Sequence, residues 1–134
     1  MLNKPRTIKY KKTRKGKLGH LEYKANSLTF GDIGLKATES GILTSKQIEA
    51  ARQAIVRKTK RQGKIWIKVF PDTPITTKST GARMGKGKGN VSHWGAKVKG
   101  GSVLFELCGV EFKLVKLALV TGGAKLPIKT KIFF

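Results

Sequence analysis

Along this chain, the spacing of apolar residues predicts a helix most clearly between Thr44 and about Gln62. Thr44 is suited to cap the amino end, with Gln47 three residues later completing a capping box, and Gly63 offers a residue that can leave the helix. Apolar or small side chains recur every three to four residues as far as Thr59. One face of this helix is therefore expected to pack and the other to be cationic.

Strands are expected where apolar residues alternate with polar ones or where Gly and Pro bound a short apolar stretch. Five stretches qualify: 28–37, which suits two short strands and a turn, then 64–70, 93–98, 102–107 and 128–134. The third and fourth are expected to pair with each other through Gly100 and Gly101. Residues 110–120 have mixed periodicity, which we interpret as a buried helix that Gly122 and Gly123 should end or fray.

Residues 73–91 contain almost no large apolar side chain and include the sequence R-M-G-K-G-K-G-N. A long segment of this kind in a small domain is expected to be irregular and either functional or disordered. Its glycine spacing matches neither the Walker loop nor the dinucleotide fingerprint. Two interpretations remain, a loop that approaches RNA closely or a flexible surface loop. The residues concerned are Arg83, Met84, Gly85, Lys86, Gly87, Lys88 and Gly89.

The net charge of the chain says more about its function than its length does. The 134 residues suit one domain, and 29 Lys and Arg against 7 Asp and Glu give a net charge of +22. Such an excess favours a polyanionic partner, nucleic acid first and an anionic membrane second. Residues 1–20 form a basic N-terminal extension, expected to be disordered when free and ordered by phosphates. The candidate phosphate-binding residues are Lys4, Arg6, Lys9, Lys11, Lys12, Arg14, Lys15 and Lys17 in this arm, and Lys46, Arg57, Lys60 and Arg61 on the first helix.

Other classes of function find little support in the sequence. Cys108, His20 and His93 form no zinc-binding pattern, and we expect no metal, no cofactor and no membrane span. Cys108 is interpreted as a small buried side chain rather than a nucleophile. Either packing in a strand or stacking on a base would suit Trp94. Trp66, between two isoleucines, is expected to be partly buried.

Several long motifs occur together and in order: Q-I-E-A-A-R at 47–52, R-Q-G-K-I-W-I-K-V-F-P-D-T-P-I-T at 61–76, the glycine-rich 83–90, and K-L-P-I-K-T at 125–130. The chain thereby resembles the bacterial-type large-subunit ribosomal protein sixteen family. The resemblance implies an α+β domain, with two helices on a mixed or antiparallel β structure, and no enzymatic activity.

The family resemblance also implies partners. These are large-subunit rRNA near the central protuberance, neighbouring ribosomal proteins, and aminoacyl-tRNA approached by the loop at 83–90. By the same resemblance Arg83 is a candidate for hydroxylation. The alternative is a basic RNA-binding assembly or translation factor outside the ribosome. An electrostatically attached membrane protein is a weaker third, because the first helix lacks large apolar anchors.

The compartment is predicted from composition. Lysine outnumbers arginine 23 to 6, and no targeting segment is recognisable at the amino end. Lysine enrichment is expected from AT-rich coding and favours synthesis inside an organelle. We therefore predict a mitochondrial ribosome first, a plastid second and the bacterial cytoplasm third.

Overall fold

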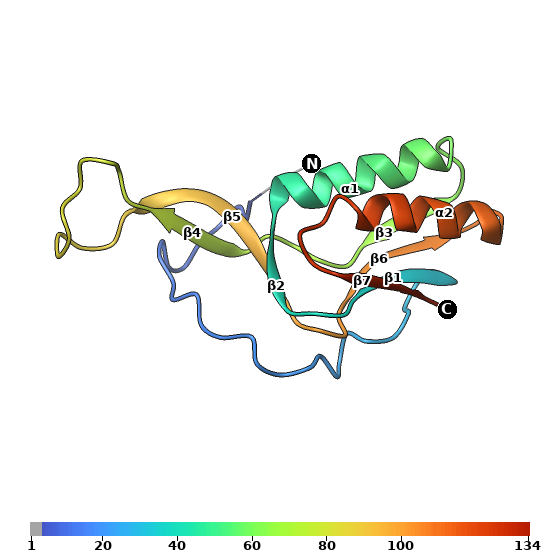
Figure 1. The fold of residues 1–134 in the computed structure, drawn as a ribbon, viewed down its shortest axis with the longest axis horizontal. Coiled ribbons are helices and arrows are strands. Elements are labelled where there is room, and N and C mark those ends of the chain that lie inside the picture. The colour runs from blue at the N-terminus through green and yellow to red at the C-terminus, as the bar shows by residue number, and fades with distance from the viewer. Residues whose placement is uncertain (1–3) are drawn as a thin grey trace.

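Two helices cover one side of a four-stranded sheet, and a three-stranded sheet extends away from this body (Figure 1). The computed structural model describes residues 4–134. In chain order its elements are β1 Ile33–Ala37, β2 Gly41–Thr44, α1 Ser45–Lys58, β3 Lys64–Ile67, β4 Thr73–Thr77, β5 Asn90–Val98, β6 Val103–Cys108, α2 Phe112–Gly123 and β7 Thr130–Phe133. These residues form a single α+β domain, which confirms the predicted fold class.

All strand pairs are antiparallel, in the orders β3-β6-β1-β7 and β2-β5-β4. The predicted pairing of 93–98 with 102–107 is wrong, because β5 and β6 belong to different sheets. The connection between β5 and β6 is hydrogen-bonded to other parts of the chain. Gly101 N–H donates to Ala37 O at 2.7 Å, and Gly100 O accepts from Glu22 N–H at 2.9 Å. Gly101 has φ +95°, a conformation that glycine adopts without strain.

The start of α1 is as predicted. The Thr44 hydroxyl accepts from Gln47 N–H at 3.3 Å, and the Gln47 side-chain oxygen accepts from Thr44 N–H at 2.9 Å, so the capping box is complete. This pair satisfies two backbone donors that the helix itself cannot.

The end of α1 comes at Lys58, before the predicted Gln62. Thr59 is buried, and its hydroxyl donates to Val56 O at 3.2 Å. Lys60 and Arg61 then take the left-handed conformation, with φ of +53° and +65°. The chain leaves the helix here because it must turn toward β3, and Lys60 and Arg61 consequently lie in the turn rather than on a helix face.

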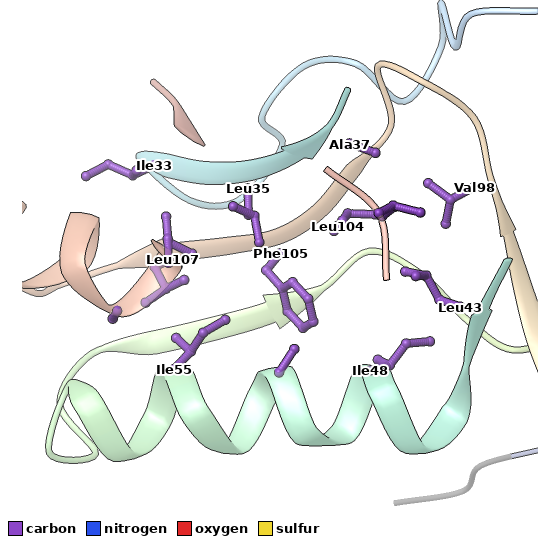
Figure 2. Close-up of a cluster of buried hydrophobic side chains, with 14 of the residues drawn as sticks. Ile33, Leu35, Ala37, Leu43, Ile48, Ile55, Val98, Leu104, Phe105 and Leu107 are labelled. Atoms are coloured by element: carbon purple, nitrogen blue, oxygen red, sulfur yellow. The ribbon is translucent and has the colours of Figure 1, made fainter. Parts of the chain in front are cut away.

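The core lies between the helices and the four-stranded sheet. Ile48 and Ile55 of α1 point toward Phe105 and Leu107 of β6 (Figure 2). The burial of Ile48, Ala51, Ile55 and Thr59 confirms the predicted packing face of this helix. Large apolar side chains fill this layer, and no disulfide bond contributes to it, because the chain has a single cysteine.

The second helix packs on one side only, so the prediction that it is buried is wrong in part. Val115, Ala118 and Leu119 are buried, whereas Phe112 and Val120 are about half exposed. Its last residues, Gly122 and Gly123, are helical, and the helix ends directly after them as predicted. A Cβ on Gly122 would lie 2.5 Å from Ile55 Cγ1, so this glycine allows the two helices to approach closely.

Three strand predictions hold in part. Only 33–37 of the segment 28–37 forms a strand, while β3 and β7 are shorter than 64–70 and 128–134. The segment 73–91 is not irregular throughout, because its ends form β4 and the start of β5, which leaves 78–89 as the loop. Pro74 pairs opposite Trp94 and Ile75 opposite His93, which gives β4 a partner strand despite its weak apolar pattern.

Glu106 is the buried charged side chain in the described part of the chain, and its exposed fraction is 0%. Its carboxylate accepts from Thr29 N–H at 3.2 Å, Phe30 N–H at 2.7 Å and Gly31 N–H at 3.0 Å, and Lys68 Nζ lies 3.6 Å away. Burial raises the pKa of Glu106, but the three N–H donors and the lysine outweigh it, so the pKa lies below its ordinary value. Residues 28–31 are therefore fixed across the sheet rather than forming a strand of it.

We expect stability to depend on the ionisation of Glu106. Because its folded pKa is lowered, its contribution is present above the unfolded pKa of about 4.3 and is lost as the pH falls through the folded pKa. Glu106→Gln should lower the free energy of unfolding at pH 7 by about 1–3 kcal/mol, since backbone donors lose a charged acceptor. It should also flatten the fall in stability between pH 6 and pH 3, measured by denaturant unfolding. Glu111→Gln, at an exposed carboxyl, is the matched control; equal pH dependence in all three proteins would contradict this role.

Candidate nucleic-acid interface

A long hairpin of β4 and β5 carries the glycine-rich loop to the far end of the molecule (Figure 1). No Asp or Glu occurs between Asp72 and Glu106, so the whole hairpin is free of acid. The side chains of Arg83, Met84, Lys86 and Lys88 are all exposed. The tip therefore presents cations and backbone with no carboxylate to neutralise them.

The glycines of the loop have two different roles. Gly85 and Gly87 have φ of +80° and +81° with open space around them, so they are needed for backbone conformation. A Cβ on Gly89 would lie 2.8 Å from Lys78 N, so this glycine lets the loop close against the end of β4. The result is a hollow of about 340 Å³, lined in part by Lys78, Lys86 and Lys88. Exposed backbone and ammonium groups in one concavity suit phosphate oxygens.

Residues 12–14 of the basic arm contact this hairpin, whereas residues 1–3 of the arm lie outside the described residues. Lys12 Nζ donates to Lys88 O at 2.9 Å, Lys88 Nζ donates to Thr13 O, and Lys97 Nζ donates to Arg14 O at 3.3 Å. The structure thus brings the arm and the loop together into one cationic surface. The eight predicted cations of the arm, Lys4, Arg6, Lys9, Lys11, Lys12, Arg14, Lys15 and Lys17, are all exposed.

The cations of α1 and of the turn after it form a second group on the body of the domain. Lys46, Arg57, Lys60 and Arg61 are exposed, as predicted, although Lys60 and Arg61 lie in the turn and not on the predicted helix face. A hollow of about 310 Å³ is lined by Arg52, Arg57 and Arg61. Arg52 is paired with Glu49 at 2.6 Å, and the hydrogen bonds from Arg52 lower the pKa of that carboxyl. Arg57 and Arg61 are then the guanidinium groups of this hollow best placed for phosphate.

Sequence reasoning missed Lys78 and Lys97 as candidate contacts. Both belong to the acid-free stretch between Asp72 and Glu106, and that stretch is the signal that could have found them. His93 is exposed on β5 and Trp94 is half-buried, so both interpretations of Trp94 stay open.

Cys108 differs from its prediction, because it is half-buried rather than buried. The Asp32 carboxylate, hydrogen-bonded to the thiol, raises the pKa of Cys108, which disfavours the nucleophilic thiolate. Over residues 4–134, no cluster of three or more His, Cys, Asp or Glu side chains could hold a metal ion. Neither helix in this part of the chain is long and apolar enough to cross a membrane.

Comparison with known proteins identifies the family of this chain. The model of the family described as ribosomal protein L16p/L10e matches residues 5–133. The chain belongs to this family. It is therefore a ribosomal protein and not an enzyme, which favours the ribosomal interpretation over an extra-ribosomal RNA-binding factor.

Individual relatives match almost from end to end. The large ribosomal subunit protein uL16 of Gluconobacter oxydans is 51% identical over 127 residues, which cover 95% of this chain and 92% of the relative. Those of Cereibacter sphaeroides and Borrelia turicatae are 52% identical over 129 residues and 48% identical over 126. The alignments cover 96% and 94% of this chain, and 93% and 91% of the two relatives respectively.

The arm surface leads to a prediction about RNA affinity. Each phosphate that a lysine or arginine neutralises releases counterions, so the logarithm of affinity should fall linearly with the logarithm of salt concentration. Replacing Lys9, Lys11, Lys12 and Arg14 together by Gln should flatten that slope by about 0.9 per lost phosphate contact and weaken binding to every RNA sequence. Filter binding of duplex RNA across a salt series measures this. Lys113→Gln with Lys116→Gln, on exposed positions of α2, is the control; an unchanged slope in the arm variant would exclude the arm from binding.

Proposed function

We propose that this ribosomal protein anchors itself to large-subunit rRNA near the central protuberance through its arm and first helix, and that its hairpin tip helps to place aminoacyl-tRNA near the peptidyl-transferase region. One observation carries the proposal. The acid-free hairpin projects its glycine-rich tip away from the body of the domain (Figure 1).

The separate roles of the body and the tip follow from the position of the core. The body contains the buried residues, whereas the tip at 78–89 is exposed almost throughout. Anchoring is assigned to the cations of the arm, Lys4, Arg6, Lys9, Lys11, Lys12, Arg14, Lys15 and Lys17, and to Lys46, Arg57, Lys60 and Arg61. The tip, with Arg83, Met84, Gly85, Lys86, Gly87, Lys88 and Gly89, is assigned to tRNA. Its small residues and positive charge suit a close approach to a phosphate backbone.

The family membership supports a place in the large ribosomal subunit. The relatives named above are proteins of the large ribosomal subunit, and this chain as a family member is a structural constituent of that subunit, with rRNA and neighbouring ribosomal proteins as partners. Arg83 is exposed at the tip, where a hydroxylating enzyme could reach it.

For the compartment we propose a mitochondrial ribosome, with a plastid and the bacterial cytoplasm as second and third candidates. The support is the composition, with 23 lysines against 6 arginines. The relatives named above are bacterial. Sequencing the genome of the source decides the matter: we expect the gene on organellar DNA, and a location on a bacterial chromosome would refute the proposal.

Changes at the tip should affect tRNA binding more than assembly. Lys86→Ala with Lys88→Ala removes two exposed charges, so the variant should still enter large subunits while aminoacyl-tRNA binding falls severalfold. Gly87→Val should be worse, because a β-branched residue is strained at φ +81°. Subunit occupancy by quantitative mass spectrometry and tRNA binding to the purified particles measure the two effects.

The matched control is Lys113→Ala with Lys116→Ala, which removes the same charge from the exposed side of α2. It should leave tRNA binding unchanged. If the tip variants fail to enter the subunit, or enter it and bind tRNA normally, the tip does not have this role.

A further inference from the structure

The face of the four-stranded sheet that lies away from the helices carries aromatic rings. Side chains alternate along a strand, and Ile65, Ile67 and Ile132 pack against the core. Trp66 and Phe133, their neighbours in β3 and β7, therefore point to the opposite face. In register, Trp66 lies beside Glu106 of β6, and Phe133 lies beside Gly34 of β1.

Phe30 joins this face from the segment that crosses the sheet. Its backbone N–H is held by Glu106, and its ring stacks on Trp66 with centroids 5.9 Å apart and planes at 19°. The Phe30 side chain is nevertheless 59% exposed, although a phenyl ring gains by burial. The backbone contact thus holds in place an aromatic ring that is largely exposed to solvent.

Each ring on this face has an ammonium group over it. Lys64 Nζ lies 5.1 Å from the Trp66 ring centroid, Lys68 Nζ 4.7 Å from that of Phe30, and Lys36 Nζ 5.1 Å from that of Phe133. Lys68 is also held by Glu106 and by the Thr29 hydroxyl at 2.9 Å. Glu106, the acid beside Trp66 in register, is itself buried. The face is aromatic and cationic, a combination that suits nucleic acid.

We propose that the Phe30–Trp66 pair is a stacking site for an unpaired base of RNA, with Lys64 taking the adjoining phosphate. The proposal rests on the proposed function, since it names a further contact of the same RNA-binding protein. An ammonium over an exposed ring strengthens binding by about 2- to 5-fold, whereas a stacked base strengthens it by about 5- to 100-fold. A base can therefore displace Lys64 from Trp66, and the released ammonium then lies within reach of the backbone of the same nucleotide.

The test uses the fluorescence of Trp66 in the full chain. Trp94→Phe removes the other tryptophan, so that the emission reports on the site alone. The probes are a single-stranded adenosine hexamer and an abasic ribose-phosphate hexamer with the same number of phosphates. Stacking predicts that the adenosine hexamer quenches Trp66 saturably and binds about 5- to 100-fold more tightly than the abasic one. Equal affinities and no quenching would overturn the proposal.

Three variants locate the effect. Phe30→Leu should lose most of the preference for the adenosine hexamer, and Phe30→Tyr should restore it, because tyrosine keeps the ring. Phe112→Leu, at an exposed ring on α2, should keep the preference in full. Should Phe30→Leu lower the thermal midpoint of unfolding, Lys64→Gln replaces it, and this variant should weaken binding of the adenosine hexamer without changing that of a mononucleoside. Retained preference in Phe30→Leu, or unchanged affinity for the adenosine hexamer in Lys64→Gln, would overturn the site.

The outcomes separate this inference from the proposed function. If both hexamers bind with the same steep salt dependence and neither quenches Trp66, anchoring by phosphate contacts stands and the stacking site is refuted. If neither hexamer binds at all, the anchoring proposal fails as well. A protein occupant of the face would give the first of these results.

Discussion

The buried carboxylate of Glu106 fixes the relation between the basic amino-terminal part of the chain and the folded body. Three successive N–H groups of residues 29–31 donate to it, and Lys68 supplies the nearby positive charge. Desolvating a carboxylate is costly, and here several hydrogen bonds and an ion pair outweigh that cost. The chain is thereby committed to cross one face of the sheet before β1 begins. That crossing places Phe30 beside Trp66.

The charge of +22 explains why the remaining architecture divides into two parts. Cations cannot enter the core without partners, and with 7 acids most of them have none. Many of them lie on the arm, on the outer side of α1 and on the β4–β5 hairpin, and others, such as Lys36 and Lys64, lie on the aromatic face of the sheet. Where arm and hairpin meet, the ammonium groups donate to backbone carbonyl oxygens of Lys88, Thr13 and Arg14. These hydrogen bonds to carbonyl oxygens hold the arm and the hairpin together only weakly, because both segments are positively charged. The surface that the two segments form therefore suits a polyanion that neutralises both.

The predictability of each feature from sequence depends on how local its cause is. The capping box of α1 depends on Thr44 and Gln47 alone, so the amino end was predictable. The carboxyl end was not, because the turn at Lys60 and Arg61 depends on where β3 must lie. The sheet membership of β5 and β6 depends on their partner strands, which are β2 and β4 for β5 and β1 and β3 for β6, and these partners lie in other parts of the chain. Glu106 lies within the apolar sequence V-L-F-E-L-C, where nothing local reveals its donors.

The residues of the candidate site were likewise predictable only where they are close in sequence. Composition and family motifs were enough to find the basic arm and the glycine-rich tip, since both are contiguous in sequence. The contact between them was not predictable, because it joins residues more than 70 positions apart, such as Lys12 and Lys88. The aromatic face is equally non-local, since Phe30, Trp66 and Phe133 come from three separate segments. Some functional residues of this molecule are therefore contiguous in sequence, and motifs reveal them. Others are brought together only by the sheet, and their arrangement depends on the fold and on Glu106. The tip lies outside the core and can vary without unfolding the body.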